Sequence, residues 1–391
     1  MKTGWSSKLL GDVCKTSSGG TPLKAKREYY ENGTIPWLLS GEVSQGDVLQ
    51  ARNFITSKGL ENSSAKVFPA NTVLVAMYGA TAGQVGILRF PAATNQAVCG
   101  ILPNQQFVPE FLFYLFLSRK DELIAQAAGN AQPNISQLKI RNTLVPIPPL
   151  PEQQRIVTLL DEAFAGIATA KANAEKNLQN ARAIFESHLQ SVFTQRGDVW
   201  TEKRLADVCA ITSTLVDPRK AEFIDLTHVG AGNIESKTGA FIELKTAREE
   251  GLISGKFLFD ESMVLYSKIR PYLMKVARPD FNGLCSADMY PLSPTPGAAD
   301  RDYLFHLLLS QHFTDYAIEG SARAGMPKVN REHLFEFRVF MPSLRRQREI
   351  AARFDDLQGE TQRLESIYQQ KLAALDELKK SLLNSAFNGD L

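Results

Sequence analysis

The sequence lacks several features that would place it at once in a common class of protein. No apolar run approaches the ~20 residues that a membrane-spanning helix needs, and residues 1–5 contain no apolar segment of the signal-peptide kind. The four cysteines show neither C-x-x-C spacing nor nearby histidines, so zinc and redox sites have little support. We therefore expect a cytoplasmic protein with no membrane segment and with buried, unreactive cysteines.

The sequence also lacks a strong charge of either sign, because its formal net charge is only +2. Residues 1–148 hold 14 basic and 9 acidic residues, a net charge of +5, whereas residues 199–340 hold 17 and 19, a net charge of −2. A phosphate-binding protein needs local basic patches rather than a basic total. The overall charge therefore neither favours nor excludes a nucleic-acid partner.

The motifs of common enzyme classes are missing too. The glycine-rich stretch at 79–86 lacks the Lys-Ser/Thr that completes a P-loop, and no G-x-G-x-x-G or G-x-S-x-G occurs. The five histidines are scattered without metal-ligand spacing. Glu243-Leu244-Lys245 matches half of a nuclease E-x-K motif, but no Pro-Asp precedes it. We predict a non-catalytic chain with no catalytic, metal or cofactor site of its own.

What the chain does contain is an internal duplication. The segment 5–14 returns at 200–209 with six identities in ten positions, and 150–156 and 187–193 return at 344–350 and 381–387. An offset of 194 or 195 residues is too long for a solenoid unit and indicates a duplicated domain with its connector. We therefore predict two domains in a pseudo-two-fold arrangement.

Each half of the duplication has mixed α and β character. Turn-rich sequence is followed by a strand, at 72–77 and 263–266, and then by a helix, at 111–126 and 303–310. The predicted fold class is α+β, with two mixed α/β domains and two long helices. The predicted boundaries are 1–148 for the first domain, 149–198 for the first long helix, 199–342 for the second domain and 343–391 for the second long helix.

The long helices follow proline-marked boundaries at 146–151 and 341–342, and each runs about 45 residues, or about 65 Å. Their apolar residues alternate in steps of four and three, as in a coiled-coil seam. Small residues in the first seam correspond to large ones in the second, which favours antiparallel pairing of the two helices within one chain. The alternative is that each helix lies separately on its own domain. The predicted pairing residues are Ile156, Leu160, Ala163, Ile167, Ala170, Ala174, Ala181 and Ile184 with Ile350, Phe354, Leu357, Leu364, Tyr368, Leu375 and Leu378.

Several of these motifs occur together in one known family. The sequence carries Gly-Gly-Thr-Pro at 19–22, Ile-Pro-Trp at 35–37, Tyr-Gly-Ala-Thr-Ala-Gly at 78–83 and Pro-Pro-Leu-Pro-Glu-Gln at 148–153. Over essentially its whole length it resembles the specificity (S) subunits of type I DNA restriction–modification systems. One departure is Met-Pro-Ser-Leu-Arg-Arg-Gln at 341–347, where the family form is Pro-Pro-Leu-x-Glu-Gln.

This resemblance implies a function and a set of partners. Each domain would be a target-recognition domain that reads one half of a bipartite, asymmetric site on double-stranded DNA, with a non-specific spacer of fixed length. The long helices would dock two methyltransferase subunits, and restriction (translocase–nuclease) subunits would join later. S-adenosylmethionine and ATP would then belong to the partner subunits. The alternatives are a coiled-coil scaffold that binds no DNA and a nuclease with a degenerate site.

Within this interpretation, we choose candidate DNA-binding residues by the side-chain types that usually contact DNA. Arg, Lys, Asn and Gln read base edges, and Lys, Ser and Thr hold phosphates. The DNA-binding candidates are Thr21, Lys24, Lys26, Arg27, Tyr78, Thr81, Gln84, Asn95, Gln96 and Asn134 in the first domain, and Lys268, Arg270, Tyr272, Lys275, Arg323, Lys328, Asn330 and Arg331 in the second.

Overall fold

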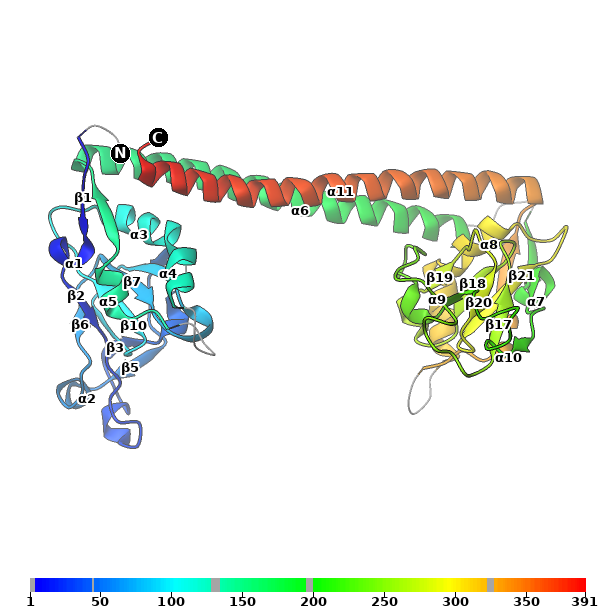
Figure 1. The fold of residues 1–391 in the computed structure, drawn as a ribbon, viewed down its shortest axis with the longest axis horizontal. Coiled ribbons are helices and arrows are strands. Elements are labelled where there is room, and N and C mark those ends of the chain that lie inside the picture. Colours follow the sequence, from blue (N-terminus) through cyan, green and yellow to red (C-terminus); the bar gives the residue numbers. More distant parts are fainter. Residues whose placement is uncertain (1–3, 44–45, 128–133, 195–199, 322–326) are drawn as a thin grey trace. The chain divides into compact units, whose positions relative to one another are not determined.

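The computed structural model describes residues 4–43, 46–127, 134–194, 200–321 and 327–391 (Figure 1). By its internal contacts the chain divides into two compact units. Unit 1 consists of Met1–Ala174 and Gln370–Leu391, and unit 2 consists of Glu175–Gln369. Each unit joins a globular α/β part to a portion of both long helices, which confirms the predicted fold class for each unit.

The globular part of unit 1 contains three sheets. The first has the order β2-β10-β7-β8-β4, and the second has the order β5-β3-β9-β6. A third sheet pairs β1 with β11 in antiparallel register, so the start of the chain lies beside the strand that leads into the first long helix. The strands are β1 (Ser6–Leu9), β2 (Thr16–Ser18), β3 (Ile35–Leu38), β4 (Gly46–Val48), β5 (Asn53–Ile55), β6 (Val67–Phe68), β7 (Thr72–Ala76), β8 (Val85–Leu88), β9 (Ala92–Thr94), β10 (Val98–Ile101) and β11 (Leu144–Ile147).

Unit 2 repeats much of this plan. The order β13-β21-β18-β19 forms one sheet, β14-β17-β20-β15-β16 forms another, and β12 pairs with β22 as β1 does with β11. The strands are β12 (Thr201–Arg204), β13 (Cys209–Ala210), β14 (Leu215–Val216), β15 (Thr227–Val229), β16 (Lys245–Thr246), β17 (Lys256–Phe259), β18 (Val264–Ser267), β19 (Val276–Ala277), β20 (Gly283–Cys285), β21 (Met289–Pro294) and β22 (Arg338–Met341).

Short helices cover the sheets and complete the cores. Unit 1 has α1 (Leu10–Val13), α2 (Ser57–Glu61), α3 (Pro109–Ser118), α4 (Lys120–Gln126) and α5 (Gln137–Arg141), and unit 2 has α7 (Leu205–Val208), α8 (Arg301–Leu308), α9 (Gln311–Glu319) and α10 (Arg331–Phe335). Single 3-10 turns are η1 (Arg27–Tyr29), η2 (Ser40–Glu42), η3 (Gly79–Thr81), η4 (Ala231–Asn233) and η5 (Pro271–Leu273).

One predicted helix is interrupted. The sequence pattern indicated a single helix over 111–126, but α3 and α4 are separated at Arg119, whose backbone has φ −93° and ψ 4°. Ser118 donates from its hydroxyl to the Leu115 carbonyl at 2.7 Å. Side-chain bonds of this kind compete with the helical pattern at a helix end.

The two long helices are α6 (Leu150–Thr194) and α11 (Leu344–Asn388). In unit 1, Lys171 pairs with Asp376, and the Arg155 guanidinium donates to the Leu391 carbonyl at 2.8 Å. In unit 2, Arg182 pairs with Glu365 at 2.9 Å, and the rings of Phe193 and Phe354 stack with centroids 5.9 Å apart. In both units residue numbers fall along α11 as they rise along α6, so the predicted antiparallel pairing is confirmed within each unit.

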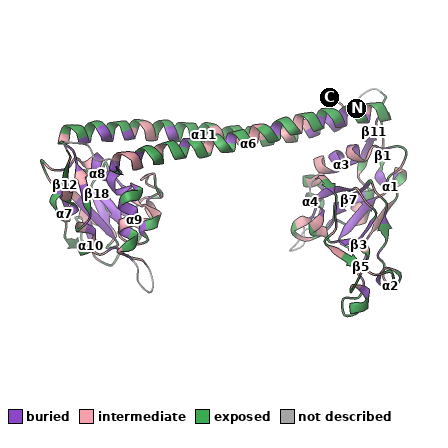
Figure 2. Cartoon of the chain, turned by 180° about the vertical axis from the view of Figure 1, so that it is seen from behind, coloured by how far each residue is buried: buried purple, intermediate pink, exposed green. Residues whose placement is uncertain are grey.

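The buried stripe of each long helix is narrow (Figure 2). Of the predicted pairing residues, the following are buried: Ile156, Leu160, Ile167, Ala174, Ala181, Ile350 and Phe354. Half-buried are Ala163, Ala170, Leu357, Tyr368 and Leu375.

For three of the predicted pairing residues the prediction was wrong, because their side chains are exposed rather than buried between the helices. Ile184 is 58% exposed, Leu378 is 46% exposed and Leu364 is 39% exposed. In each case the next residue along the helix, Phe185, Lys379 or Glu365, is half-buried instead. A straight α-helix turns about 20° per heptad relative to a strict 3.5-residue repeat, so a seam extended at a fixed phase drifts off the buried face.

Candidate nucleic-acid interface

In unit 1, the Gly19-Gly20 pair holds the first recognition loop against a neighbouring loop. Gly20 donates its N–H to the Thr94 carbonyl at 2.9 Å. A Cβ atom on Gly19 would lie 2.2 Å from the same carbonyl oxygen, so this approach requires glycine. Thr21, which follows, donates from its hydroxyl to the side-chain oxygen of Gln96. The close approach of the two loops therefore places Thr21 beside Gln96.

Two further segments join this surface through main-chain hydrogen bonds. Met77 donates to the Ala97 carbonyl at 2.8 Å, and Ile135 donates to the Met77 carbonyl at 2.9 Å. Tyr78 and Asn134 form an isolated antiparallel bridge, and both are exposed. The predicted DNA-contacting residues of these loops are thus neighbours in space.

Some candidates in unit 1 use their polar atoms to shape the loops. The Asn95 side-chain oxygen accepts from the Ala97 N–H at 3.2 Å, and the Thr81 hydroxyl donates to the Tyr78 carbonyl at 3.3 Å. Both residues are half-buried, as is Gln84. The hydrogen bonds of Asn95 and Thr81 therefore stabilise the turns that carry the exposed residues of these loops.

A basic segment follows the first loop of unit 1. Lys24, Lys26 and Arg27 are all exposed, and the structure records no ion pair for them among the described residues. Lys26 donates to the Tyr29 hydroxyl at 3.2 Å, and its ammonium lies 5.2 Å from the Tyr29 ring centroid. Tyr29 is buried, so it fixes this segment to the core and leaves the three cations facing solvent.

Unit 2 builds its recognition surface with the same main-chain contacts. Ile269 and Lys328 form an isolated bridge, as Tyr78 and Asn134 do in unit 1. Arg270 donates its N–H to the Pro327 carbonyl at 2.9 Å, and Val329 donates to the Lys268 carbonyl at 2.8 Å. The predicted segments 268–275 and 327–331 therefore lie together.

Lys268 is an internal member of this surface, since its side chain is only 12% exposed. Its ammonium donates to the Ala287 carbonyl and lies 5.2 Å from the Tyr290 ring centroid. Burial lowers the pKa of Lys268, and the positive charges of Lys328 and Arg331 lower it further. Lys268 therefore lies close to two other cations, Lys328 and Arg331, and to one carboxylate, Asp288, at 3.9 Å.

The exposed cations of this surface have no carboxylate partners among the described residues of unit 2. Arg270 and Lys328 are exposed, and the exposed Arg331 guanidinium lies 5.8 Å from the Tyr290 ring centroid. Tyr272 is 53% exposed and adds an aromatic ring. Unpaired cations beside an exposed aromatic ring suit a nucleic-acid surface.

Two of the remaining DNA-binding candidates of unit 2 make hydrogen bonds that stabilise its fold, and a third is not among the described residues. The half-buried Lys275 donates from its ammonium to the Ala231 carbonyl at 2.6 Å. Asn330 caps α10, accepting from the His333 N–H at 2.7 Å. Arg323 lies outside the described residues.

A buried glutamine joins each globular part to its long helix. In unit 1 the Gln153 amide donates to the carbonyls of Gln106 at 2.8 Å and Pro148 at 2.9 Å, and it accepts from the Val108 N–H at 2.9 Å. Val108 is the N-cap residue of α3 and has no side-chain cap of its own. Gln153 thus caps α3 from the first turn of α6.

Gln347 does the same in unit 2. Its amide donates to the carbonyls of Ala298 at 3.1 Å and Pro342 at 2.9 Å, and it accepts from the N–H of Asp300, the N-cap of α8, at 2.8 Å. Both glutamines are fully buried. The joint is therefore retained although the sequence before Gln347 departs from the family pattern.

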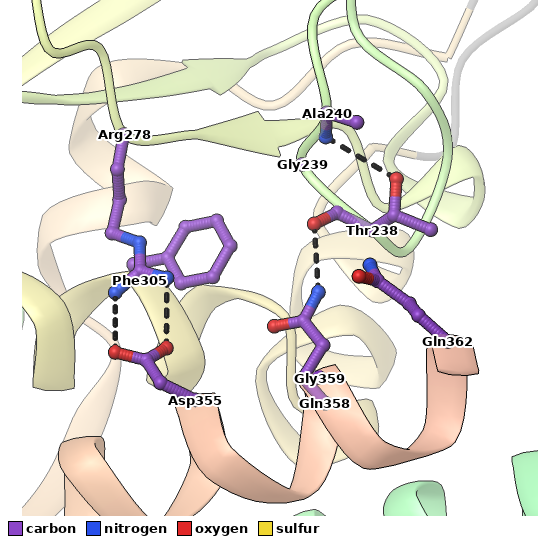
Figure 3. Close-up of a pocket in the computed structure, with 9 residues that line it drawn as sticks. All are labelled: Thr238, Gly239, Ala240, Arg278, Phe305, Asp355, Gln358, Gly359 and Gln362. Carbon is purple, nitrogen blue, oxygen red and sulfur yellow. Dashed lines mark hydrogen bonds and ion pairs between the residues drawn. The ribbon is translucent and has the colours of Figure 1, made fainter. Parts of the chain in front are cut away.

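Unit 2 reinforces its joint with charge (Figure 3). Arg278 reaches from the globular part to α11 and donates to both carboxylate oxygens of Asp355, at 3.1 and 2.8 Å, while its guanidinium lies 4.2 Å from the Phe305 ring centroid. A neighbouring contact joins the Gln358 amide to the Thr238 carbonyl at 2.9 Å. These contacts hold the globular part of unit 2 on one face of α11.

A titratable residue on α8 completes this network. His306 is fully buried and its Nε2 lies 2.8 Å from Asp355. Burial alone would raise the pKa of Asp355, but hydrogen bonds from His306 and Arg278 outweigh it and hold that pKa well below its usual range. In unit 1 the corresponding contact joins Tyr114 to Asp161, so the two joints differ in chemistry.

Sequence reasoning missed the residues of both joints. Gln153 and Gln347 were within reach, since each stands at the same place in the repeated segments 150–156 and 344–350. Arg278 and His306 left no signal, because their importance depends on which carboxylate the fold brings beside them.

Two kinds of feature are absent from the described residues. No group of three or more His, Cys, Asp or Glu side chains is placed to hold a metal ion in this part of the chain. No helix there is both long and apolar enough to cross a membrane.

Comparison with known proteins identifies relatives that match most of the chain. The chain is 30% identical over 315 residues to the type I restriction enzyme EcoDI specificity subunit of Escherichia coli, covering 72% of this chain and 70% of that protein. It is 21% identical to the type I restriction enzyme MjaVIII specificity subunit of Methanocaldococcus jannaschii, covering 99% and 93%.

Solved structures share the fold. A chain from a study of complex assembly and conformational transition of the type I R-M system matches with a TM-score of 0.79 at 21% identity, covering 100% of this chain and 99% of that chain. The HsdS subunit from Thermoanaerobacter tengcongensis matches with a TM-score of 0.67 at 19% identity, covering 100% and 98%. The family model described as "Type I restriction modification DNA specificity domain" matches twice, at residues 2–179 and 198–373. This chain therefore belongs to the family of type I restriction–modification DNA specificity proteins.

Proposed function

We propose that this chain is the DNA-recognition subunit of a type I restriction–modification complex and reads a bipartite, asymmetric target. The observation that carries the proposal is that both units present exposed cations with no ion pair to any described residue. They are Lys24, Lys26 and Arg27 in unit 1 and Arg270, Lys328 and Arg331 in unit 2. Cations without carboxylate partners are available to phosphates and base edges. Because the side chains of the two loop sets differ, each unit would read a different half-site.

The rest of the complex would supply the chemistry. We propose that the exposed faces of α6 and α11 dock methyltransferase subunits, which would bind S-adenosylmethionine, and that ATP-dependent restriction subunits join them. The chain itself would position DNA and catalyse nothing. We also propose that the complex is cytoplasmic, because it would have to reach the DNA that it reads.

The decisive experiment changes the length of the two paired helices. Seven residues are deleted from α6, and the seven residues that face them are deleted from α11. Each deletion removes about two turns, or about 10 Å, of helix. DNA rises 3.4 Å per base pair, so the preferred spacer between half-sites should shorten by about three base pairs. The measurement is binding of the complex with its methyltransferase partner to duplexes that differ only in spacer length.

The same experiment tests the alternative of a scaffold that does not bind DNA. A scaffold would keep its partner binding and show no spacer preference before or after the deletion. Equal affinity of the unmodified complex for all spacer lengths would refute the fixed-spacer proposal. A matched substitution of seven exposed residues, without change of length, controls for damage to the docking faces.

A further inference from the structure

The recognition loops of the two units can be compared residue by residue through their hydrogen bonds. Met77 donates to Ala97 in unit 1 as Lys268 donates to Asp288 in unit 2, at 2.8 and 3.0 Å. The N–H at the base of each loop likewise bonds across it, from Ala76 to the Gln84 carbonyl at 2.9 Å and from Ser267 to the Lys275 carbonyl at 3.0 Å. Segment 76–84 therefore corresponds to segment 267–275.

Within this alignment, two positions in each loop have left-handed backbone conformation. In unit 1 they are Gly79 and Gly83, with φ of 72° and 78°. In unit 2 they are Arg270 and Met274, with φ of 50° and 48°. Glycine adopts this conformation freely, whereas a residue with a Cβ is strained there. Unit 2 therefore carries strain in its recognition loop that unit 1 avoids.

The strain at Arg270 is increased by its neighbour. Arg270 directly precedes Pro271, and the proline ring restricts the preceding residue to extended conformations. The backbone is nevertheless pinned, because its N–H donates to Pro327 at 2.9 Å and its carbonyl accepts from Leu273 at 2.9 Å. Strain of this kind persists where the surroundings hold it and occurs often at functional sites.

The two strained residues differ in what their side chains gain. Met274 is half-buried and packs against the apolar core of unit 2, so burial of its side chain offsets the strain. The Arg270 side chain is exposed and has no hydrogen bond, ion pair or ring contact with any described residue. No contact with a described residue therefore offsets the backbone strain at position 270.

We propose that Arg270 is the residue that reads a base in the half-site of unit 2, with its guanidinium donating to the edge of a guanine in the major groove. This inference rests on the proposed function. Arginine is the side chain that pairs most often with guanine, through two parallel hydrogen bonds. Fixed placement of the backbone lowers the cost of holding that geometry.

A base contact explains the strain better than a phosphate contact does. Phosphates line the whole duplex and can be met from many positions, and the exposed, unstrained Lys328 and Arg331 already stand beside the loop to meet them. A base edge must be approached from one point in one direction. The held backbone of Arg270 satisfies that requirement at the cost of strain.

The first test measures stability. Arg270→Gly should leave the thermal unfolding midpoint unchanged or raise it, because glycine relieves the strain and the chain loses no internal contact. Met274→Gly is the matched control at the other strained position, and it should lower the midpoint because it removes a packed side chain. A midpoint for Arg270→Gly as low as that of the control would show a structural role for the arginine and overturn the proposal.

The second test measures base preference. The complex with its methyltransferase partner selects duplexes from a random library, and the wild type should enrich two separated blocks of fixed sequence. Arg270→Gly should randomise one guanine position in one block only, with about 5- to 150-fold weaker binding to the wild-type consensus duplex. Arg270→Lys, which keeps the charge and loses the fork, should also lose the base preference.

Each remaining outcome of the selection decides between the two proposals. If Arg270→Gly weakens binding equally for consensus and random duplexes, as expected for Lys328→Ala, the contact is to phosphate and the inference fails. If Arg270→Gly leaves the enriched sequence unchanged, the inference also fails while the proposed function stands. If the wild-type complex enriches no sequence, the proposed function itself is refuted, and the inference with it.

Discussion

Replacing Gln153 with leucine should weaken the joint between the globular part of unit 1 and α6. Leucine is close in volume but can neither donate nor accept, so three hydrogen bonds of 2.8 to 2.9 Å are lost together. The Val108 N–H and the Pro148 carbonyl would be left in a buried setting without their partner. Each unsatisfied buried group costs about 1–3 kcal/mol, and the exposed Gln106 would regain water at its carbonyl. With two such groups, we expect a loss of about 2–6 kcal/mol in the free energy of unfolding.

Chemical denaturation of the full chain measures this loss. In a Trp200→Phe background the tryptophan fluorescence reports on unit 1 through Trp5 and the buried Trp37. The control is Gln154→Leu, one position along α6, where the side chain is exposed and makes no recorded hydrogen bond. It should change the free energy of unfolding by less than about 0.5 kcal/mol. If the two variants unfold alike, the buried glutamine does not hold the joint and the reasoning is wrong.

Two further predictions concern the packing and electrostatics of unit 2. Phe185→Ala should cost about 2–3 kcal/mol because Phe185 packs against the core, whereas Ile184→Ala should cost under about 0.5 kcal/mol, and denaturant titration compares them directly. Equal losses of stability in the two variants would contradict the assignment of Phe185, rather than Ile184, to the buried face of α6. His306→Gln should flatten the pH dependence of stability below about pH 6.5: burial lowers the pKa of His306 in the folded state, so the unfolded chain binds more protons and wild-type stability falls as the pH falls. A thermal midpoint that falls as steeply in the variant would contradict this assignment.

The fold was predictable where it depends on spacing along the chain. The duplication and the two proline-bounded helices are visible without a structure, because helical periodicity and helix breaking are local properties. The phase of the seam was not, since a small rotation per heptad accumulates over many turns and moved Ile184 out and Phe185 in. Register along a long helix is set by the partner helix and the domains packed on it.

The candidate interface was predictable as a set of loops and less so as a set of side chains. Residue type alone could not separate the exposed Arg270 from the half-buried Lys268, which is held by Tyr290. It also could not show that Asn330 is a helix cap. These roles depend on tertiary neighbours, whereas the strained backbone at Arg270 depends on dihedral angles that no composition or motif reveals.

The way the loops are attached explains how one frame can carry two different readers. In both units the recognition loops are joined by main-chain hydrogen bonds, such as that from Ile135 to Met77 and that from Val329 to Lys268. Every residue except proline offers the same main-chain donor and acceptor, so these bonds survive substitution of the side chains between them. The loop residues are then limited mainly at the positions of positive φ, where glycine costs least. Arg270 occupies one such position. We therefore expect substitutions of Arg270 to change both the DNA sequence that is preferred and the stability of unit 2.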